Sequence, residues 1–130
     1  MGPMECYCDK HQAASHGKYI MNVQQMFEDY IRPQENGSHY DCSYVRLTDK
    51  KRGFAAFSKQ SFSFNASEYT QEELTKKAHN FELVECEDTV LCLDYAQNGV
   101  GSNSCGPELL KKYRLDAEQF TFEIMLQPEA

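Results

Sequence analysis

Four side chains near the start of the sequence could bind a metal ion. Cys6 and Cys8 are separated by a single residue, and His11 and His16 follow shortly after them. In an extended segment, two thiolates at alternate positions share one face, and zinc accepts cysteine and histidine ligands in a tetrahedral set. The gap between the cysteines is shorter than is usual in zinc sites, and partly buried thiols with surface imidazoles explain the same residues. A zinc-binding protein therefore stays open as one hypothesis.

The acidic side chains form no comparable candidate site. Adjacent acids occur at Glu28-Asp29 and Glu72-Glu73, and a solvated surface explains such pairs without catalysis. Cys105 lies in a loop of small residues where a thiol could face a ligand, but a cysteine nucleophile needs a neighbouring base. No histidine is near Cys105 in the sequence. The stretch 99–101 lacks the lysine and the further glycines of a phosphate-binding loop.

Short strands are the elements that must position these residues. Alternating side chains predict strands over residues 42–47, 54–58, 62–64 and 120–126, and a run of apolar residues predicts a further strand over residues 90–95. Thr70 followed by Glu73 forms a capping-box pattern and predicts one short helix over residues 71–79. Several short strands, one helix and frequent turns predict an all-β fold, an antiparallel β-sandwich in a single domain.

The composition disfavours several classes of protein. The 130 residues, 41% hydrophobic and 25% charged, suit one globular domain and argue against disorder. The net charge of −7 disfavours binding to nucleic-acid phosphates. The longest apolar stretches, such as Thr89–Leu93, are too short to cross a bilayer. Six cysteines with no secretory signal at Met1 predict reduced thiols in a cytoplasmic protein.

Three segments, in order along the chain, resemble one enzyme family. The pattern Gly-Pro-x-Glu-x-Tyr-x-Asp occupies residues 2–9, and the pattern Tyr-x-x-Pro-x-Glu-Asn-Gly occupies residues 30–37. The glycine- and serine-rich stretch of residues 99–107 is followed by Tyr-Arg-Leu at residues 113–115. Together these segments resemble the C-terminal domain of large bacterial β-galactosidases of glycoside hydrolase family 2. The resemblance covers nearly the whole chain.

The resemblance implies a fold and a function. The family's C-terminal domain, its small-chain domain, is an all-β supersandwich like that of galactose mutarotases. Residues 1–130 correspond to the C-terminal portion of that domain, so its first half is expected to be missing. The parent enzymes hydrolyse terminal non-reducing β-D-galactosides with two glutamates in a TIM barrel far upstream. No acid here matches those glutamates, so we expect no catalytic residue in this segment and no hydrolysis by the isolated chain.

The resemblance also points to residues that line the galactose pocket. The family's loop near its C-terminus ends in a tryptophan that stacks on the substrate, and Cys105 occupies the matching position here. A thiol covers the apolar face of galactose less well than an indole. Cys105 is therefore expected either to line the subsite with weaker packing or to fill space. The weaker candidates, for sugar contacts or for local turns, are Ser102, Asn103, Ser104, Glu35 and Asn36.

Partners and cofactors follow from the same resemblance. The expected partners are the rest of the β-galactosidase chain and the β-galactoside substrate, and neither nucleic acid nor a membrane is expected. A half-sandwich exposes strand edges and apolar surface, so a homo-oligomer is expected as well. Parent enzymes commonly use magnesium and sodium bound elsewhere, and no cofactor or metal is expected in this segment. The alternative function is a non-catalytic carbohydrate-binding module, which would need an aromatic platform.

Overall fold

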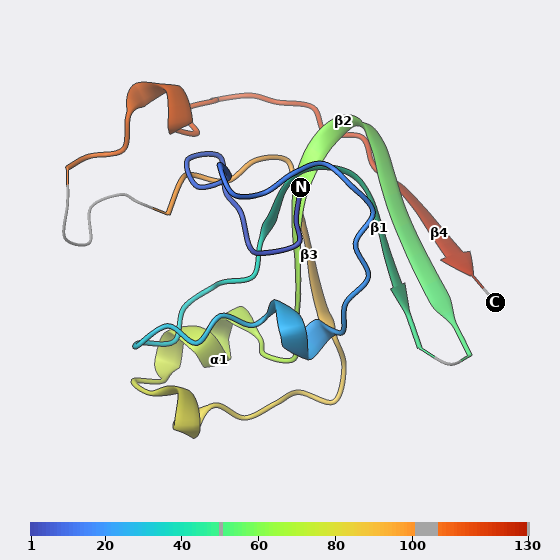
Figure 1. Ribbon diagram of the computed structural model, residues 1–130, viewed down its shortest axis with the longest axis vertical. Helices are drawn as coiled ribbons and strands as arrows, with labels where there is room; N and C mark the ends of the chain where they lie inside the picture. The colour runs from blue at the N-terminus through green and yellow to red at the C-terminus, as the bar shows by residue number, and fades with distance from the viewer. Residues whose placement is uncertain (50, 101–106, 130) are drawn as a thin grey trace.

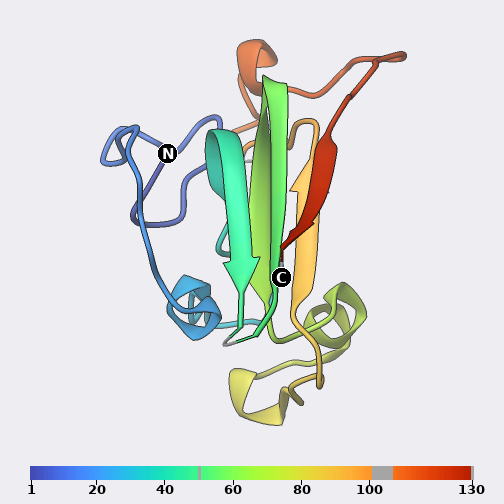
Figure 2. The same ribbon diagram turned by 90° about the vertical axis from the view of Figure 1, so that its right-hand side faces the viewer.

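The centre of the molecule is one antiparallel sheet of four strands. The computed structural model describes residues 1–49, 51–100 and 107–129 (Figure 1). The strands are β1 (His39–Thr48), β2 (Gly53–Ser67), β3 (Val90–Asp94) and β4 (Met125–Glu129). Strand β2 lies between β1 on one edge and β3 and β4 on the other, where β4 pairs with its first half and β3 with its second half (Figure 2).

Helical elements are short and lie outside the sheet. The α-helix α1 (Gln71–Lys76) is accompanied by three 3-10 turns, η1 (Val23–Met26), η2 (Asn80–Glu82) and η3 (Lys111–Tyr113). Figure 2 places α1 and η2 beyond one end of the strands and η3 beyond the other end. Within the described ranges, the antiparallel all-β architecture with one short α-helix is confirmed, and the single sheet found there is consistent with one layer of the expected sandwich. No helix in the described part of the chain is long and apolar enough to span a bilayer.

The start of α1 agrees with its sequence signal, but its end does not. The Thr70 hydroxyl accepts a hydrogen bond from the backbone N–H of Glu73 (3.1 Å), as an N-cap residue should. The Glu73 carboxylate accepts the backbone N–H of Val84 (2.9 Å), a contact that the capping-box pattern does not include. The helix ends at Lys76, three residues before the predicted end.

Two of the predicted strands differ from those observed. Residues 54–58 and 62–64 belong to the single long strand β2, which continues through the polar residues 58–61. The register of its pairing with β1 shifts on both sides of Cys42. Both halves of β2 therefore pair with β1, but in different registers. The predicted strand at 120–126 pairs only from Met125 onward. Phe122 and Ile124 pack against the core without belonging to a strand.

The apolar core is small and lies against one face of the sheet. Alternation places neighbouring residues of β2 on opposite faces. The side chains of the buried cluster are Val45, Ala56 and Phe62, and the apolar side chains that pack against them are Phe54, Phe64, Leu93, Phe122 and Ile124. On the other face, the Asn65 side chain donates to the carbonyl oxygen of Asn36 (3.1 Å), which ties the segment before β1 to the sheet.

Candidate functional site

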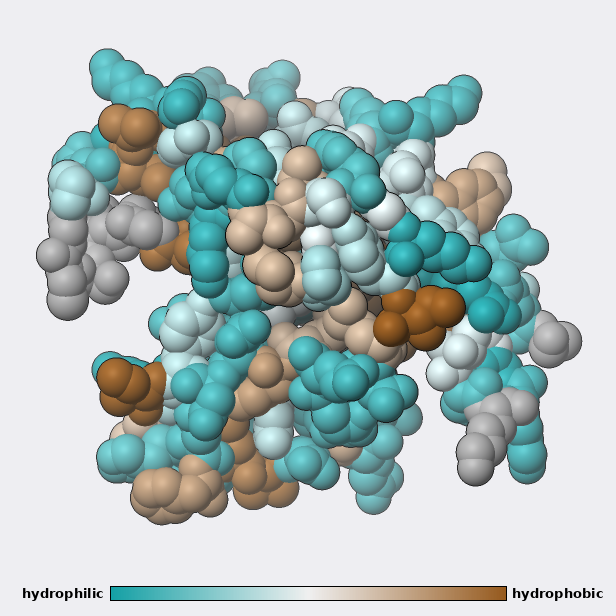
Figure 3. Space-filling view, viewed as in Figure 1, coloured by the Kyte–Doolittle hydropathy of each residue, from teal (hydrophilic) through white to brown (hydrophobic). Residues whose placement is uncertain are grey.

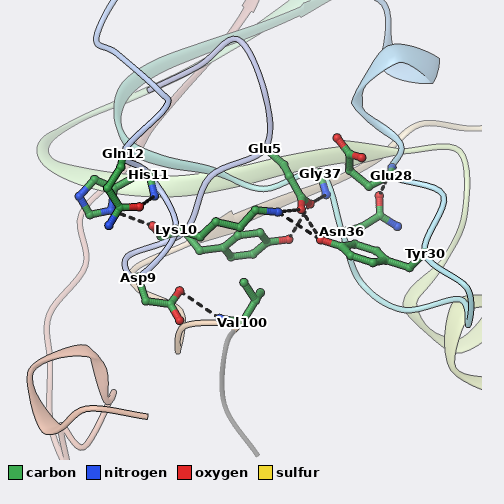
Figure 4. Close-up of polar contacts among 11 residues, drawn as sticks. Glu5, Asp9, Lys10, His11, Gln12, Glu28, Tyr30, Asn36, Gly37 and Val100 are labelled. Atoms are coloured by element: carbon green, nitrogen blue, oxygen red, sulfur yellow. Dashed lines mark hydrogen bonds and ion pairs between the residues drawn. The ribbon is translucent and has the colours of Figure 1, made fainter. Parts of the chain in front are cut away.

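A buried carboxylate joins the first two sequence motifs. Glu5 accepts hydrogen bonds from Lys10 Nζ (2.7 Å), the backbone N–H of Gly37 (2.9 Å) and the Tyr7 hydroxyl (3.2 Å). The Tyr30 hydroxyl donates to the same carboxylate. These four donors converge on Glu5 from residues 7–10 and 30–37, as Figure 4 shows for the labelled side chains. The segments that resemble one family in sequence are therefore in direct contact.

The environment of Glu5 keeps this carboxylate ionised. Burial alone would raise its pKa, but the hydrogen bonds from Lys10, Tyr30 and Gly37 outweigh burial and hold the pKa below its ordinary value. Burial and the neighbouring Glu5 charge raise the pKa of Tyr7, and burial followed by the Glu5 hydrogen bond raises that of Tyr30. An anion surrounded by protonated donors is a stable acceptor and a poor general acid. Glu5 is thus suited to holding segments together.

The turn at residues 34–37 explains the second motif. The Asn36 side chain accepts the backbone N–H of Glu28 (2.9 Å) and donates to the Gln34 carbonyl oxygen (2.9 Å). Gly37 follows with φ of 70°, and a Cβ built there would lie 2.3 Å from the carbonyl oxygen of Met26. Only glycine fits this left-handed position without moving the backbone.

The first motif also contacts the third. Asp9 Oδ1 accepts the backbone N–H of Val100 (3.1 Å; Figure 4). The Cys8 thiol lies 3.6 Å from the carbonyl oxygen of Gln97 and 3.7 Å from that of Tyr113, with geometry that allows it to donate to either. Residues 2–9 therefore touch both of the other motifs, one through Glu5 and one through Cys8 and Asp9.

Comparison with known proteins agrees with this convergence of motifs. A family profile described as "Beta galactosidase small chain" matches residues 1–126. The chain belongs to the β-galactosidase small-chain family. The resemblance seen in the sequence is thereby confirmed.

Three curated relatives of this chain are much longer proteins. A "Beta-galactosidase" of Actinobacillus pleuropneumoniae is 50% identical over 119 residues, which is 92% of this chain and 11% of the relative. One from Staphylococcus xylosus is 39% identical over 97% of this chain and 13% of its own length. One from Kluyveromyces lactis is 34% identical over 96% of this chain and 12% of its own length. The small-chain segment thus spans only about an eighth of these relatives.

The structure describes only two of the residues predicted to line the galactose pocket. The candidates Ser102, Asn103, Ser104 and Cys105 lie outside the described residues. Asn36 is buried and its side chain is hydrogen-bonded within its own turn, while Glu35 is exposed beside α1, where its carboxylate accepts from the Gln71 side chain (3.4 Å). A substrate contact by either Glu35 or Asn36 stays a prediction.

The structure does not bring the four candidate zinc ligands together. Cys6 is buried and its sulfur accepts the backbone N–H of Tyr40 (3.3 Å), while Cys8 faces the third motif. The His16 ring hydrogen-bonds the Asp41 carboxylate (2.9 Å). Across the described ranges, no group of three or more histidine, cysteine, aspartate or glutamate side chains could hold a metal ion.

A cleft of about 410 Å³ opens beside Cys8 and combines polar with aromatic side chains. Its lining includes Gln60, Ser61, Ser63, Tyr95, Gln97 and Tyr113. The Tyr95 ring stacks on Phe120 with ring centroids 4.4 Å apart and planes at 9°. The Lys112 ammonium lies 4.5 Å from the centroid of the Tyr113 ring. One face of each tyrosine ring is therefore occupied within the chain.

Sequence reasoning gave no role to Glu5 or Asp9. Both residues stand inside a recognised motif, and that position was the only signal available. Their partners are far away along the chain: Gly37 is 32 residues from Glu5, and Val100 is 91 residues from Asp9. Spacing within a motif carries no information on contacts of that range.

Proposed function

We propose that this chain is a non-catalytic segment of a β-galactosidase that hydrolyses terminal non-reducing β-D-galactosides. It corresponds to the C-terminal portion of the small-chain domain, which it helps to build, and its third motif lines the galactose pocket. The observation that supports this most is the match of residues 1–126 to the small-chain family within relatives named β-galactosidase. The contacts of Glu5, Cys8 and Asp9 add a physical reason for the three motifs to occur together.

The acids of this segment take no part in the proposed chemistry. A retaining glycosidase needs two carboxyl groups about 5 Å apart, one of them protonated to act as an acid. Glu5 has a lowered pKa and four donors, so it has neither role. Asp94 has a raised pKa, first through burial and then through the Glu35 charge, but the Gln97 amide donates to it (2.9 Å). We assign Asp94 a structural role at the end of β3 and leave catalysis to the upstream part of the enzyme.

The surface of the chain suits a large covering partner. The accessible surface is 9386 Å², whereas a compact monomer of 15.0 kDa exposes roughly 7,000 Å². Apolar residues are exposed at several separate places on the face seen in Figure 3. The most exposed large ones in the described ranges include Ile20, Ile31, Phe81, Val84, Leu110 and Met125. The rest of the β-galactosidase chain is the proposed cover.

Further parts of the proposal concern assembly and cofactors. In isolation the chain associates with further copies through the same apolar surface, because that surface then lacks its natural cover. The intact enzyme acts in the cytoplasm and uses magnesium and sodium bound outside this segment. Cys105 stands where relatives of the family place a tryptophan, and it lines the subsite with less packing area.

Titration of galactose or lactose into the isolated chain separates this proposal from a carbohydrate-binding module. We expect no saturable heat in calorimetry at millimolar sugar, because in this proposal the chain lines only part of a galactose pocket that the rest of the enzyme completes. Mannitol is the matched control for heats of dilution. Saturable binding of galactose but not of mannitol would favour the binding module.

A further inference from the structure

We propose that an exposed apolar patch around Phe81, surrounded by acidic residues, docks on a basic surface in the rest of the β-galactosidase chain. The Phe81 patch consists of Ile31, Phe81 and Val84. This inference rests on the proposed function, and it names the place and the chemistry of one contact within the intact enzyme. The patch includes part of η2, which lies at the end of the sheet opposite to η3 (Figure 2).

The three side chains of the Phe81 patch are among the most exposed apolar ones in the described part of the chain. Ile31 is 98% exposed, Phe81 86% and Val84 66%. The Asn80 side chain donates to the carbonyl oxygen of Tyr30 (2.7 Å), which joins the segment that carries Ile31 to the segment that carries Phe81. Single exposed apolar residues are ordinary, whereas a group of them marks an interaction surface. Aromatic side chains often contribute much of the binding energy at such surfaces.

The chain holds Phe81 on an ordered turn. The backbone N–H of Glu82 donates to the carbonyl oxygen of His79 (3.0 Å), and the His79 ring stacks on Phe81 with ring centroids 5.1 Å apart and planes at 13°. The backbone N–H of Val84 donates to the Glu73 carboxylate (2.9 Å), which attaches the next residues to α1. A surface that is already ordered loses little conformational freedom when a partner binds.

The charge around the Phe81 patch indicates the chemistry of its partner. Residues 28–35 and 68–88 hold ten acids and three lysine or arginine residues, whereas the remaining residues hold ten of each kind. The two segments that carry the patch therefore account for the whole net charge of −7. Asp29, Glu87 and Asp88 are exposed. An apolar patch with acidic surroundings is complementary to an apolar surface with basic surroundings.

A second copy of this chain does not offer such a surface. Two copies that met patch to patch would bring like charges together, which disfavours binding. Outside the two acidic segments, the chain has no excess of positive charge. The self-association proposed above must therefore use other apolar residues. Since the chain spans only 11% to 13% of its relatives, we assign the basic partner surface to the remainder of the enzyme.

Hydroxyl-radical footprinting of the intact β-galactosidase tests this docking directly. Hydroxyl radicals oxidise exposed phenylalanine rings, and mass spectrometry measures the product at Phe81. We expect Phe81 to be oxidised at least about fivefold more slowly in the intact enzyme than in the isolated chain, because the centre of an interface is desolvated. Equal oxidation rates in the two proteins would overturn the inference.

Charge reversal tests the basic character of the partner. Glu87→Lys combined with Asp88→Lys in the intact enzyme should speed up Phe81 oxidation about twofold at low salt, and less in about 0.5 M salt, where charges are screened. The matched control is Asp116→Lys combined with Glu118→Lys, two exposed acids outside both segments, which should leave Phe81 oxidation unchanged. Both double variants should keep the urea midpoint of the isolated chain. Unchanged Phe81 oxidation in the first variant would overturn the basic partner.

The inference and the proposed function can fail separately. Footprinting needs no activity, and hydrolysis of a nitrophenyl β-galactoside by the same preparation tests the proposed function. An active enzyme in which Phe81 is oxidised as fast as in the isolated chain overturns the docking surface alone. An inactive protein in which Phe81 is protected removes the proposed function and supports the docking surface.

Discussion

Replacing Glu5 with alanine is expected to lower the free energy of unfolding of the chain by about 3 kcal/mol, because buried donors lose their acceptor. Its side chain is 3% exposed, and the backbone N–H of Gly37 and the Tyr7 hydroxyl both point at it. Lys10 is 53% exposed and returns to water, so the cost comes from the donors that remain inside. Urea denaturation followed by tyrosine fluorescence measures the change, since the chain contains no tryptophan.

Glu87→Ala is the matched control for this experiment, since Glu87 is exposed. We expect it to change the unfolding free energy by less than about 0.5 kcal/mol. An equal loss of unfolding free energy in Glu5→Ala and Glu87→Ala would contradict the assignment of Glu5 as the residue that joins the first two motifs.

The pH dependence of stability gives a second view of the same residue. The pKa of Glu5 is held below its ordinary value of 4.5, so its stabilising contribution is complete above pH 4.5 and is lost as the pH falls through the lower pKa of the folded state. The difference in stability between wild type and Glu5→Gln should therefore shrink as the pH falls below 4.5. A difference that grows on acidification would contradict this charge assignment.

The second large effect is expected at Gly37. Gly37→Ala should destabilise the chain by about 3 kcal/mol, because it places a Cβ in the left-handed region and drives it against a backbone carbonyl. That Cβ would lie 2.3 Å from the oxygen of Met26, an atom that cannot move without shifting η1. A shift of the turn would also withdraw the Gly37 N–H from Glu5. The same denaturation assay measures the loss.

Gly17→Ala provides the comparison for Gly37→Ala. A Cβ built on Gly17 would meet the hydroxyl end of the Tyr19 side chain at 3.0 Å, and this partly exposed side chain can move aside. We expect Gly17→Ala to be nearly neutral. Equal effects at the two glycines would show that the turn at residues 34–37 tolerates a side chain.

The sequence signals that succeeded were local. The Thr70 cap depends on neighbouring residues and is formed as expected. Strand alternation located β1 and a run of apolar residues located β3, because each pattern depends on a single strand. It failed at residues 59–61, which are polar and exposed yet continue β2, since pairing with β1 resumes after a shift of register. It also placed the last strand too early, because Phe122 and Ile124 are packed without being paired.

The candidate site was predictable only as a set of motifs. The resemblance marked residues 2–9, 30–37 and 99–107 as belonging together, and the family match confirms that reading. The physical connection through Glu5 and Asp9 required coordinates, because each hydrogen bond joins residues tens of positions apart. The exposed surface in excess of a compact monomer likewise appears only once the chain is folded.

Hydrolysis of a nitrophenyl β-galactoside tests the central claim most directly. The assay compares the purified chain, the parent β-galactosidase lacking residues 1–130, and the two mixed together, with Asp94→Asn as a variant of the chain. We predict no turnover by the chain alone and activity in the mixture above that of the truncated enzyme, unaffected by Asp94→Asn. Turnover by the isolated chain that disappears in Asp94→Asn would contradict the account, because it would place a catalytic acid within this segment.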